Sequence, residues 1–135
     1  MRTKNVSVVA FLAAGMLSVV SAGPAAAADV LLPHPGPDGL LWVEEQTGDG
    51  GVVSAGAWDR LPTVLTVACE GGGSVHATME SQGNQVADLT VDCPVGTTGT
   101  GTVSMDPGMV TGSFSIGIDA SDDTIRWALT VTQPE

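Results

Sequence analysis

The stretch TIRWALTV, residues 124–131, decides the fold class, because apolar and mostly polar side chains alternate along it. Ile125, Trp127, Leu129 and Val131 occupy every second position, with threonine, arginine and alanine between them. Successive side chains of a β-strand point to opposite faces, so this period of two predicts a strand with one buried face. Trp127 belongs to the apolar face and is therefore expected in the core.

The segment Gly112–Ile118 repeats the same alternation. Phe114, Ile116 and Ile118 are separated by serine and glycine. The short polar segment Asp119–Asp123 lies between this stretch and residues 124–131, and it has the composition of a turn. The two stretches are therefore expected to form a C-terminal hairpin.

Further upstream, six segments have the length and spacing of strands, while glycine and proline interrupt the chain too often for helices. In order, these segments are Leu40–Gln46, Val52–Trp58, Val64–Cys69, Ser74–Glu80, Val86–Cys93 and Thr100–Met105. About seven to eight short strands separated by turns indicate an all-β fold. We expect an antiparallel β-sandwich, immunoglobulin-like or resembling a small barrel.

The first 28 residues have the pattern of a Sec-type export signal. Arg2 and Lys4 precede the apolar stretch Val6–Val20, and a run of small residues ends at Ala26-Ala27-Ala28. Signal peptidase recognises this order of charged, apolar and small residues, and the apolar stretch is too short for a membrane-spanning helix. The sequence thus predicts a signal peptide over residues 1–28 and a secreted protein that begins at Asp29.

Removal of the signal leaves 107 residues. They suffice for one sandwich domain over residues 40–135, which would bury roughly 65% of the surface of the unfolded chain. Residues 29–39 form a proline-rich lead-in before it. Its three prolines fix φ and lack backbone donors, so an extended and mobile segment is expected, with His34 between the first two prolines.

The cysteine pair constrains how the strands are arranged. Two cysteines, Cys69 and Cys93, in an exported chain predict one intramolecular disulfide, and closing its loop should stabilise the fold by roughly 3.5 kcal/mol. If residues 64–69, 74–80 and 86–93 formed a flat meander, the two cysteines would lie about 9.5 Å apart, beyond the reach of a disulfide. The pair therefore favours a strand that crosses to a second sheet, or cysteines that leave the sheet at its rim.

The predicted secreted part is strongly acidic. All 15 acidic residues follow residue 28, but of the basic residues only Arg60 and Arg126 do, so residues 29–135 carry a net charge of −13. Affinity for nucleic acid and for anionic headgroups comes largely from lysine and arginine. We therefore expect no nucleic-acid partner and, after signal cleavage, no membrane partner.

Motifs for catalysis are missing from the sequence. A Ser-His-Asp triad needs a histidine beside the nucleophile, but the secreted part has only His34, in the lead-in, and His76, whose position opposite an apolar face predicts exposure. The pattern Gly72-x-Ser74 is followed by His76 where a nucleophile elbow has glycine. Gly96–Gly101 lacks the features of a nucleotide-binding loop and is expected to be a flexible loop. The sequence predicts no catalytic residue, no enzyme activity and no cofactor.

Metal-binding patterns are also incomplete. Two distant histidines and two oxidised cysteines do not make a zinc site. The segment Asp119–Asp123 groups three carboxylates and a hydroxyl, which are ligands that calcium prefers. It lacks the full spacing and the distal glutamate of a calcium loop, and aspartate and serine are common in turns. We therefore expect a plain turn at Asp119, Asp122 and Asp123, and no metal site.

Two tryptophans are candidates for a binding surface, because indole rings stack on sugars and anchor protein partners. Trp42 follows two leucines, so one side chain of this group faces outward if the segment is a strand. Trp58 lies at a strand end beside Asp59-Arg60. Either tryptophan is a candidate contact residue, and the sequence leaves open which one is exposed.

Three parts of the chain together resemble a family of small secreted β-proteins of actinobacteria such as Streptomyces. They are VACEGGGSV (67–75), LTVDCP (89–94) and IRWALTV (125–131), which contribute a cysteine pair and a terminal tryptophan strand. The family has no assigned activity, so the resemblance implies an exported β-protein and transfers no site residue. Subtilisin-inhibitor-like proteins are similar in size and secretion, but their two-disulfide framework is missing here.

These observations predict a secreted, non-catalytic interaction module whose ligand, an extracellular protein or a cell-wall component, is unknown. The alternative is a secreted inhibitor of a peptidase or other enzyme, which needs a convex loop held rigid against its target. Glu70–Ser74, beside the disulfide, or Pro94–Gly101 would supply such a loop. Their many glycines argue against that rigidity.

Overall fold

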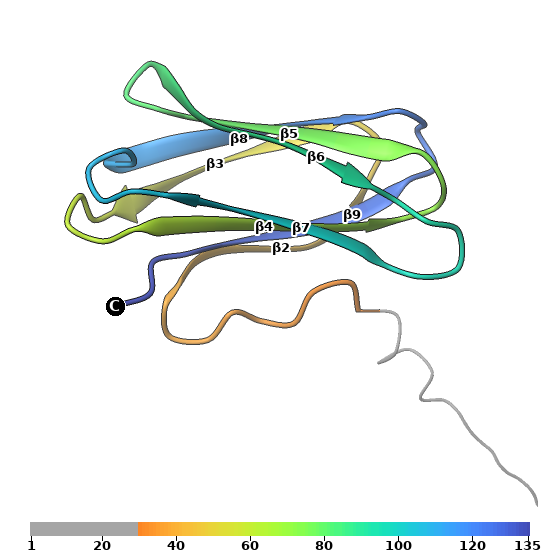
Figure 1. Ribbon diagram of the computed structural model, residues 1–135, viewed down its shortest axis with the longest axis horizontal. Helices are drawn as coiled ribbons and strands as arrows, with labels where there is room; N and C mark the ends of the chain where they lie inside the picture. The colour runs from red at the N-terminus through yellow and green to blue at the C-terminus, as the bar shows by residue number, and fades with distance from the viewer. Residues whose placement is uncertain (1–29) are drawn as a thin grey trace, which may run out of the picture. The chain divides into compact units, whose positions relative to one another are not determined.

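The computed structural model describes residues 30–135, so the predicted signal peptide and its cleavage site lie outside the described residues. Eight strands form two four-stranded sheets that pack face to face (Figure 1), and every strand pair is antiparallel. The prediction of an all-β sandwich is confirmed. Within the described range, no helix has the length and apolar character needed to cross a membrane.

The two sheets are named here by their strand order. Sheet I has the order β2-β9-β4-β7, made of β2 (Gly39–Thr47), β9 (Arg126–Thr132), β4 (Thr63–Glu70) and β7 (Gly99–Met105). Sheet II has the order β3-β8-β5-β6, made of β3 (Gly50–Ala57), β8 (Gly112–Ala120), β5 (Ser74–Ser81) and β6 (Asn84–Asp92). Each strand expected from the sequence is present, with ends shifted by one or two residues.

The core lies between the sheets and is built from the alternating apolar positions. Trp127 is fully buried there, as predicted, together with side chains such as Leu65, Met79 and Ile116. Its indole N–H donates to the carbonyl oxygen of Gly48 at 2.7 Å, which satisfies the one polar atom of the ring.

The connection from β8 to β9 shows that the predicted C-terminal hairpin is wrong. β8 pairs with β3 and β5 in sheet II, whereas β9 pairs with β2 and β4 in sheet I. Residues 121–125 therefore cross between the sheets. The two strands face each other across the core instead of pairing, and both arrangements require one apolar face on each strand, so alternation alone does not distinguish them.

The disulfide between Cys69 and Cys93 joins the two sheets. Its Cα atoms are 5.0 Å apart. Cys69 lies in β4 of sheet I, whereas Cys93 directly follows β6, which forms a hairpin with β5 in sheet II. The cysteine pair was predicted to disfavour a flat meander, and this prediction is confirmed.

The start of β7 corrects the expected flexible loop over Gly96–Gly101. Gly99 and Gly101 already belong to β7 and pair with β4. A Cβ on Gly99 would overlap the carbonyl oxygen of Asp92, and a Cβ on Gly101 would come within 2.8 Å of the Val91 side chain. These glycines let β6 and β7, the edge strands of opposite sheets, lie close together on one side of the sandwich.

The lead-in packs against sheet I, so its expected mobility is wrong from Leu31 onward. Leu31 is buried against Ala68 and Ala128 on the outer face of the sheet, and the Leu32 carbonyl oxygen accepts a hydrogen bond from the Trp42 indole at 3.2 Å. The two small alanine side chains leave room for an apolar side chain on a face that is otherwise mostly polar. Leu31 fills that recess.

Candidate functional site

Of the three tryptophans, only Trp58 is well exposed. It begins the segment Trp58–Leu61 between β3 and β4, called the Trp58 turn below, and its side chain is 58% exposed. The Leu61 N–H donates to the Trp58 carbonyl oxygen at 3.4 Å and closes the turn. Trp42 is half-buried, and His34 lies edge-on to its ring at 5.0 Å between centroids.

The backbone of the Trp58 turn is held by Gln133, a buried side chain with 5% exposure. The Gln133 Oε1 accepts the Trp58 N–H at 2.9 Å, and Nε2 donates to the Trp58 carbonyl oxygen at 2.8 Å and to the Thr63 hydroxyl at 3.1 Å. Both ends of the amide are thus engaged, as a buried polar group requires. The indole is presented to solvent from a fixed backbone.

Gln133 is not among the residues predicted from the sequence to be functional, although its position carries a signal. It continues the inward-facing series of Trp127, Leu129 and Val131 by one more step of two residues. A glutamine at the next inward position must find buried hydrogen-bond partners, and here they belong to a loop 75 residues earlier.

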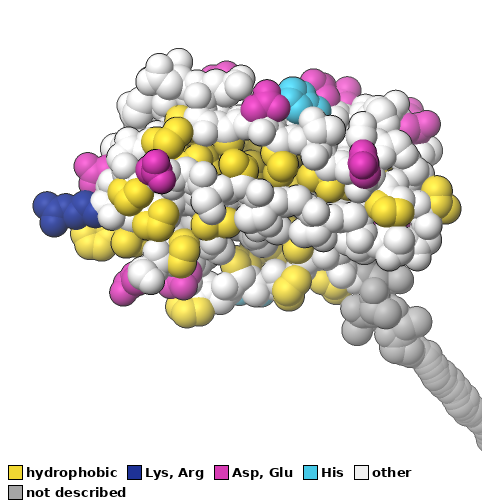
Figure 2. All heavy atoms as spheres, in the orientation of Figure 1, with side chains coloured by type: hydrophobic (Ala, Val, Ile, Leu, Met, Phe, Trp, Pro, Cys, Tyr) yellow, Lys and Arg dark blue, Asp and Glu magenta, His cyan; other side chains and the backbone are white. Residues whose placement is uncertain are grey.

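The Trp58 turn shares one end of the sandwich with the loop between β7 and β8, where Met109 is exposed. Arg60 is also exposed, and it takes part in no ion pair within residues 30–135. Figure 2 shows a dark-blue basic side chain projecting from the left end of the molecule, with yellow apolar side chains beside it. Tryptophan, methionine and arginine are enriched in protein interfaces.

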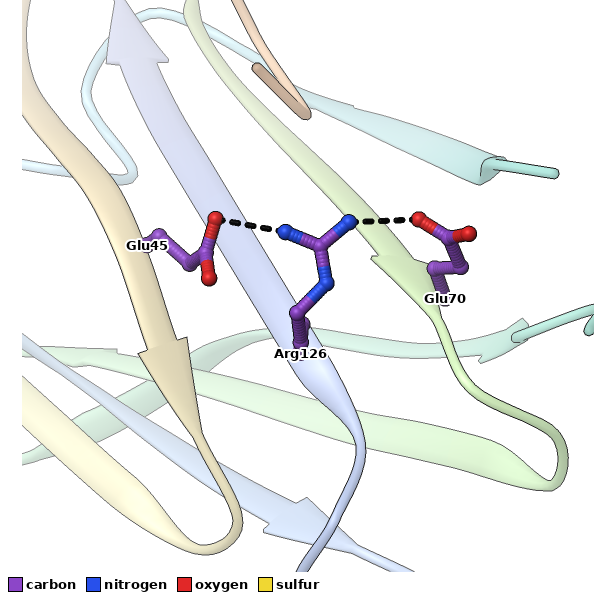
Figure 3. Close-up of polar contacts among 3 residues, drawn as sticks. All are labelled: Glu45, Glu70 and Arg126. Atoms are coloured by element: carbon purple, nitrogen blue, oxygen red, sulfur yellow. Dashed lines mark hydrogen bonds and ion pairs between the residues drawn. The ribbon is translucent and has the colours of Figure 1, made fainter. Parts of the chain in front are cut away.

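The other arginine of the described chain is fully paired on the outer face of sheet I (Figure 3). Arg126 Nη1 donates to Glu45 Oε1 at 2.7 Å, and Nη2 donates to Glu70 Oε1 at 2.6 Å. The hydrogen bonds to Glu70 and then Glu45 raise the pKa of the Arg126 guanidinium above its ordinary value. Because these residues come from β9, β2 and β4, the cluster ties three strands together and is structural.

The histidines do not form a catalytic group. His76 lies on the outer face of β5, as its position predicts, and its Nε2 contacts Asp88 Oδ1 of β6 at 2.8 Å. Asp119 of β8 is the register partner of His76. No hydrogen bond joins His76 to a hydroxyl group in the described part of the chain, and His34 packs on Trp42 of sheet I. An exposed pair such as His76 and Asp88 contributes about 0–1 kcal/mol to the stability of the fold.

The acidic turn does not bring its carboxylates together as ligands. Asp122 Oδ1 accepts the backbone N–H of Thr124 at 2.9 Å and the Thr124 hydroxyl at 2.8 Å. These hydrogen bonds hold the pKa of the Asp122 carboxyl below its ordinary value of 3.8. From residue 30 to 135, no three histidine, cysteine or acidic side chains are grouped so that they could hold a metal ion.

The opposite end of the sandwich carries the disulfide and the loop Gly71–Gly73 between β4 and β5, called the glycine loop below. The Gly71 and Gly72 N–H groups donate to the carbonyl oxygens of Pro94 and Cys93 at 3.0 and 2.7 Å, and the Cys93 N–H donates to Gly73 at 2.9 Å. These hydrogen bonds tie the glycine loop to the chain after β6, so its backbone is held in place despite its three glycines. Val95, just beyond, is 80% exposed.

No protein-family model matches this chain, and no curated protein is similar to it in sequence. One solved structure with some similarity is the K3 cleaved adhesin domain of Lys-gingipain (Kgp) from Porphyromonas gingivalis w83. The TM-score is 0.42 and the identity 14%, over 65% of this chain and 66% of the adhesin domain, just under two thirds of its length. A likeness of this degree carries no conclusion about function.

Proposed function

We propose that this protein is a secreted, non-catalytic binding module that contacts its partner through the Trp58 turn. The observation that carries the proposal is the pair formed by exposed Trp58 and buried Gln133. A binding surface gains affinity when its anchor is ordered before the partner arrives, because less conformational entropy is lost on association. Arg60 lies two residues further along the same turn, and arginine, like tryptophan, is common in binding hot spots.

Secretion is supported by the export pattern of residues 1–28 and by a disulfide, a bond that persists in oxidising compartments. The acidic composition favours an extracellular protein or a cell-wall component as the partner, and disfavours nucleic acid and anionic membranes. The placement of His34 against Trp42 of sheet I and of His76 on β5 of sheet II keeps the two histidines apart, which supports a non-catalytic role.

An inhibitor of a secreted peptidase is the second candidate, and Val95 is the observation that favours it. This exposed apolar side chain follows a disulfide-bonded cysteine, and the neighbouring backbone is tied to Gly71 and Gly72. A convex loop held in this way meets the rigidity requirement of a protease inhibitor.

A thermal-shift screen tests both candidates. Residues 29–135 are screened against secreted proteases, cell-wall polymers and sugars, since a ligand that binds only the folded state raises its melting temperature. The proposal expects the shift to be lost in Trp58→Ala and kept in Val95→Ala. Stoichiometric protease inhibition that is lost in Val95→Ala and kept in Trp58→Ala would establish the inhibitor instead.

A further inference from the structure

The outer strand of sheet II, β3, presents an unpaired main-chain edge. It pairs only with β8, in regular register from Gly50 to Ser54 against Ile118 to Phe114, and the register shifts only beyond Ser54. Outside the sheet ladders, no backbone hydrogen bond within residues 30–135 involves β3. Five consecutive residues thus offer a regular strand edge to a further strand.

This edge also lacks the usual protection. Natural edge strands carry charged side chains, proline, or a covering segment that prevents pairing with another chain. The sequence of β3, GGVVSAGA, contains no charge and no proline. The other edges differ, since β2 carries Glu44 and Glu45, and β6 and β7 lie against each other more extensively than β3 lies against β2.

A shallow hollow of about 170 Å³ lies beside β3 on the outer face of sheet II. Its sides come from three strands and one turn: Val53 of β3, Ser113, Phe114 and Ser115 of β8, Glu80 of β5, and Gln82-Gly83 between β5 and β6. Val53 is 77% exposed. An apolar side chain and a carboxylate therefore border the same hollow.

The rim of the hollow is fixed in an unfavourable backbone conformation. Gln82 has φ of 54°, the one non-glycine residue with positive φ in the described chain. Its Nε2 donates to the Thr111 carbonyl oxygen at 2.8 Å, and the buried Ser81 hydroxyl accepts the Thr111 N–H at 3.1 Å. Glycine or asparagine is usual at such a turn position, and here the side-chain hydrogen bond of Gln82 holds the turn that borders the hollow against the Thr111 segment.

We propose that the β3 edge and this hollow bind an extended, basic peptide segment of a partner protein, which adds a strand to sheet II. The proposal rests on the proposed binding function, but not on Trp58. An extended peptide has the alternating N–H and C=O groups that complete the β3 edge, and alternate side chains then lie beside Val53 on the outer face of sheet II. Glu80 lies on β5, two strands further in, so only a long side chain such as lysine or arginine extends over Val53 toward its carboxylate. The net charge of −13 favours the same basic side chains and disfavours a second copy of this chain.

The test uses a fluorescent, capped heptapeptide of alternating lysine and valine. It is compared with two peptides of the same sequence, one methylated at the lysine nitrogens and one at the valine nitrogens, because only one of these sets faces β3. A glutamate-valine peptide is the charge control. Binding to residues 29–135 is followed by fluorescence anisotropy, and the contacted residues by backbone amide chemical shifts. Glu80→Gln is the protein variant, and Glu44→Gln, on the edge strand of sheet I, is its matched control.

We expect the lysine peptide to bind with shifts at Gly50–Ser54 and around the hollow. Methylation of the set of nitrogens that faces β3 should weaken binding at least about tenfold, since it removes main-chain hydrogen bonds, whereas methylation of the other set should have little effect. Glu80→Gln should weaken binding about threefold, as for an exposed charge pair, and Glu44→Gln should have no effect. Equal binding of the unmethylated and both methylated peptides, shifts away from β3, no binding at all, or pairing of β3 with a second copy would each overturn the inference. Loss of β3 binding while a Trp58-dependent ligand still binds would leave the proposed function intact.

Discussion

The side-chain amide of Gln133 forms hydrogen bonds with both main-chain polar groups of Trp58. It accepts from the Trp58 N–H at 2.9 Å and donates to the Trp58 carbonyl oxygen at 2.8 Å. Gln133 directly follows β9 of sheet I, and Trp58 directly follows β3, the edge strand of sheet II. The pair therefore links the segment after β9 to the loop between β3 and β4. The loop thereby becomes part of the fixed structure, while the indole stays in solvent.

Replacing Gln133 by alanine should therefore destabilise the fold. The change leaves the Trp58 N–H, the Trp58 carbonyl oxygen and the Thr63 hydroxyl without this partner, and an unsatisfied buried polar group costs about 1–3 kcal/mol. Urea denaturation of residues 29–135 measures the loss. Gln46→Ala, at an exposed position of β2, is the control. If Gln133→Ala lowers the free energy of unfolding no more than Gln46→Ala does, the hydrogen bonds of Gln133 contribute nothing to stability.

Much of the fold could be predicted from the sequence, because strand alternation and turn composition are local properties. The spacing of Cys69 and Cys93 also disfavours a flat meander, since the separation of the outer strands exceeds disulfide reach. Whether the strands before and after residues 121–125 pair or cross was not predictable in the same way. Both choices bury the same apolar faces, and only the packing of whole sheets selects between them.

The candidate site was less predictable, because its decisive contacts join distant residues. Trp58 was a candidate from its charged neighbours, but its exposure depends on a loop position that Gln133 sets across 75 residues of sequence. The prolines of residues 29–39 predict a mobile lead-in, and the alternation along residues 124–131 places Ala128 on a mostly polar face, so neither pattern predicts that Leu31 packs there. Two small side chains on neighbouring strands form an apolar recess that neither strand shows alone.

Removing the disulfide should reduce stability strongly. The double variant Cys69→Ala/Cys93→Ala loses the constraint on a loop that separates the cysteines by 24 residues, worth about 3.5 kcal/mol in the chain-entropy model. Denaturant unfolding of the variant and of the oxidised protein measures the difference. Two free thiols in the denatured, unreduced protein, or equal stability of the two forms, would contradict a bridge between the sheets.

Removing the charge of Arg126 should destabilise the fold modestly. Arg126→Met leaves Glu45 and Glu70 without their shared cation, and we expect a loss of about 1 kcal/mol that shrinks at high salt. The matched control, Arg60→Met, removes an exposed arginine outside any described ion pair and should have almost no effect on stability. If Arg126→Met and Arg60→Met lower the free energy of unfolding equally, the cluster of Arg126, Glu45 and Glu70 does not tie the strands together.

The Asp122 turn should make a pH-dependent contribution. Its pKa is lowered in the folded state, so the stability it contributes is present above the ordinary value of 3.8 and is lost as pH falls through the lower folded value. Asp122→Ala should lower the melting temperature at pH 7, and the gap to the unchanged protein should narrow below about pH 4. Glu44→Ala serves as a surface control. If the difference in melting temperature between the two proteins instead widens on acidification, the pKa of Asp122 is not lowered by folding.

The indole N–H spectrum of residues 29–135 shows directly whether the protein binds through the Trp58 turn. Trp127 donates to Gly48 and Trp42 to Leu32, whereas the Trp58 indole forms no hydrogen bond within residues 30–135 and is open to solvent. Titration with a ligand that raises the melting temperature should shift the Trp58 signal and leave those of Trp127 and Trp42 in place. A ligand that shifts only the Trp42 signal, or leaves Trp58 unmoved at saturation, would contradict binding through the Trp58 turn.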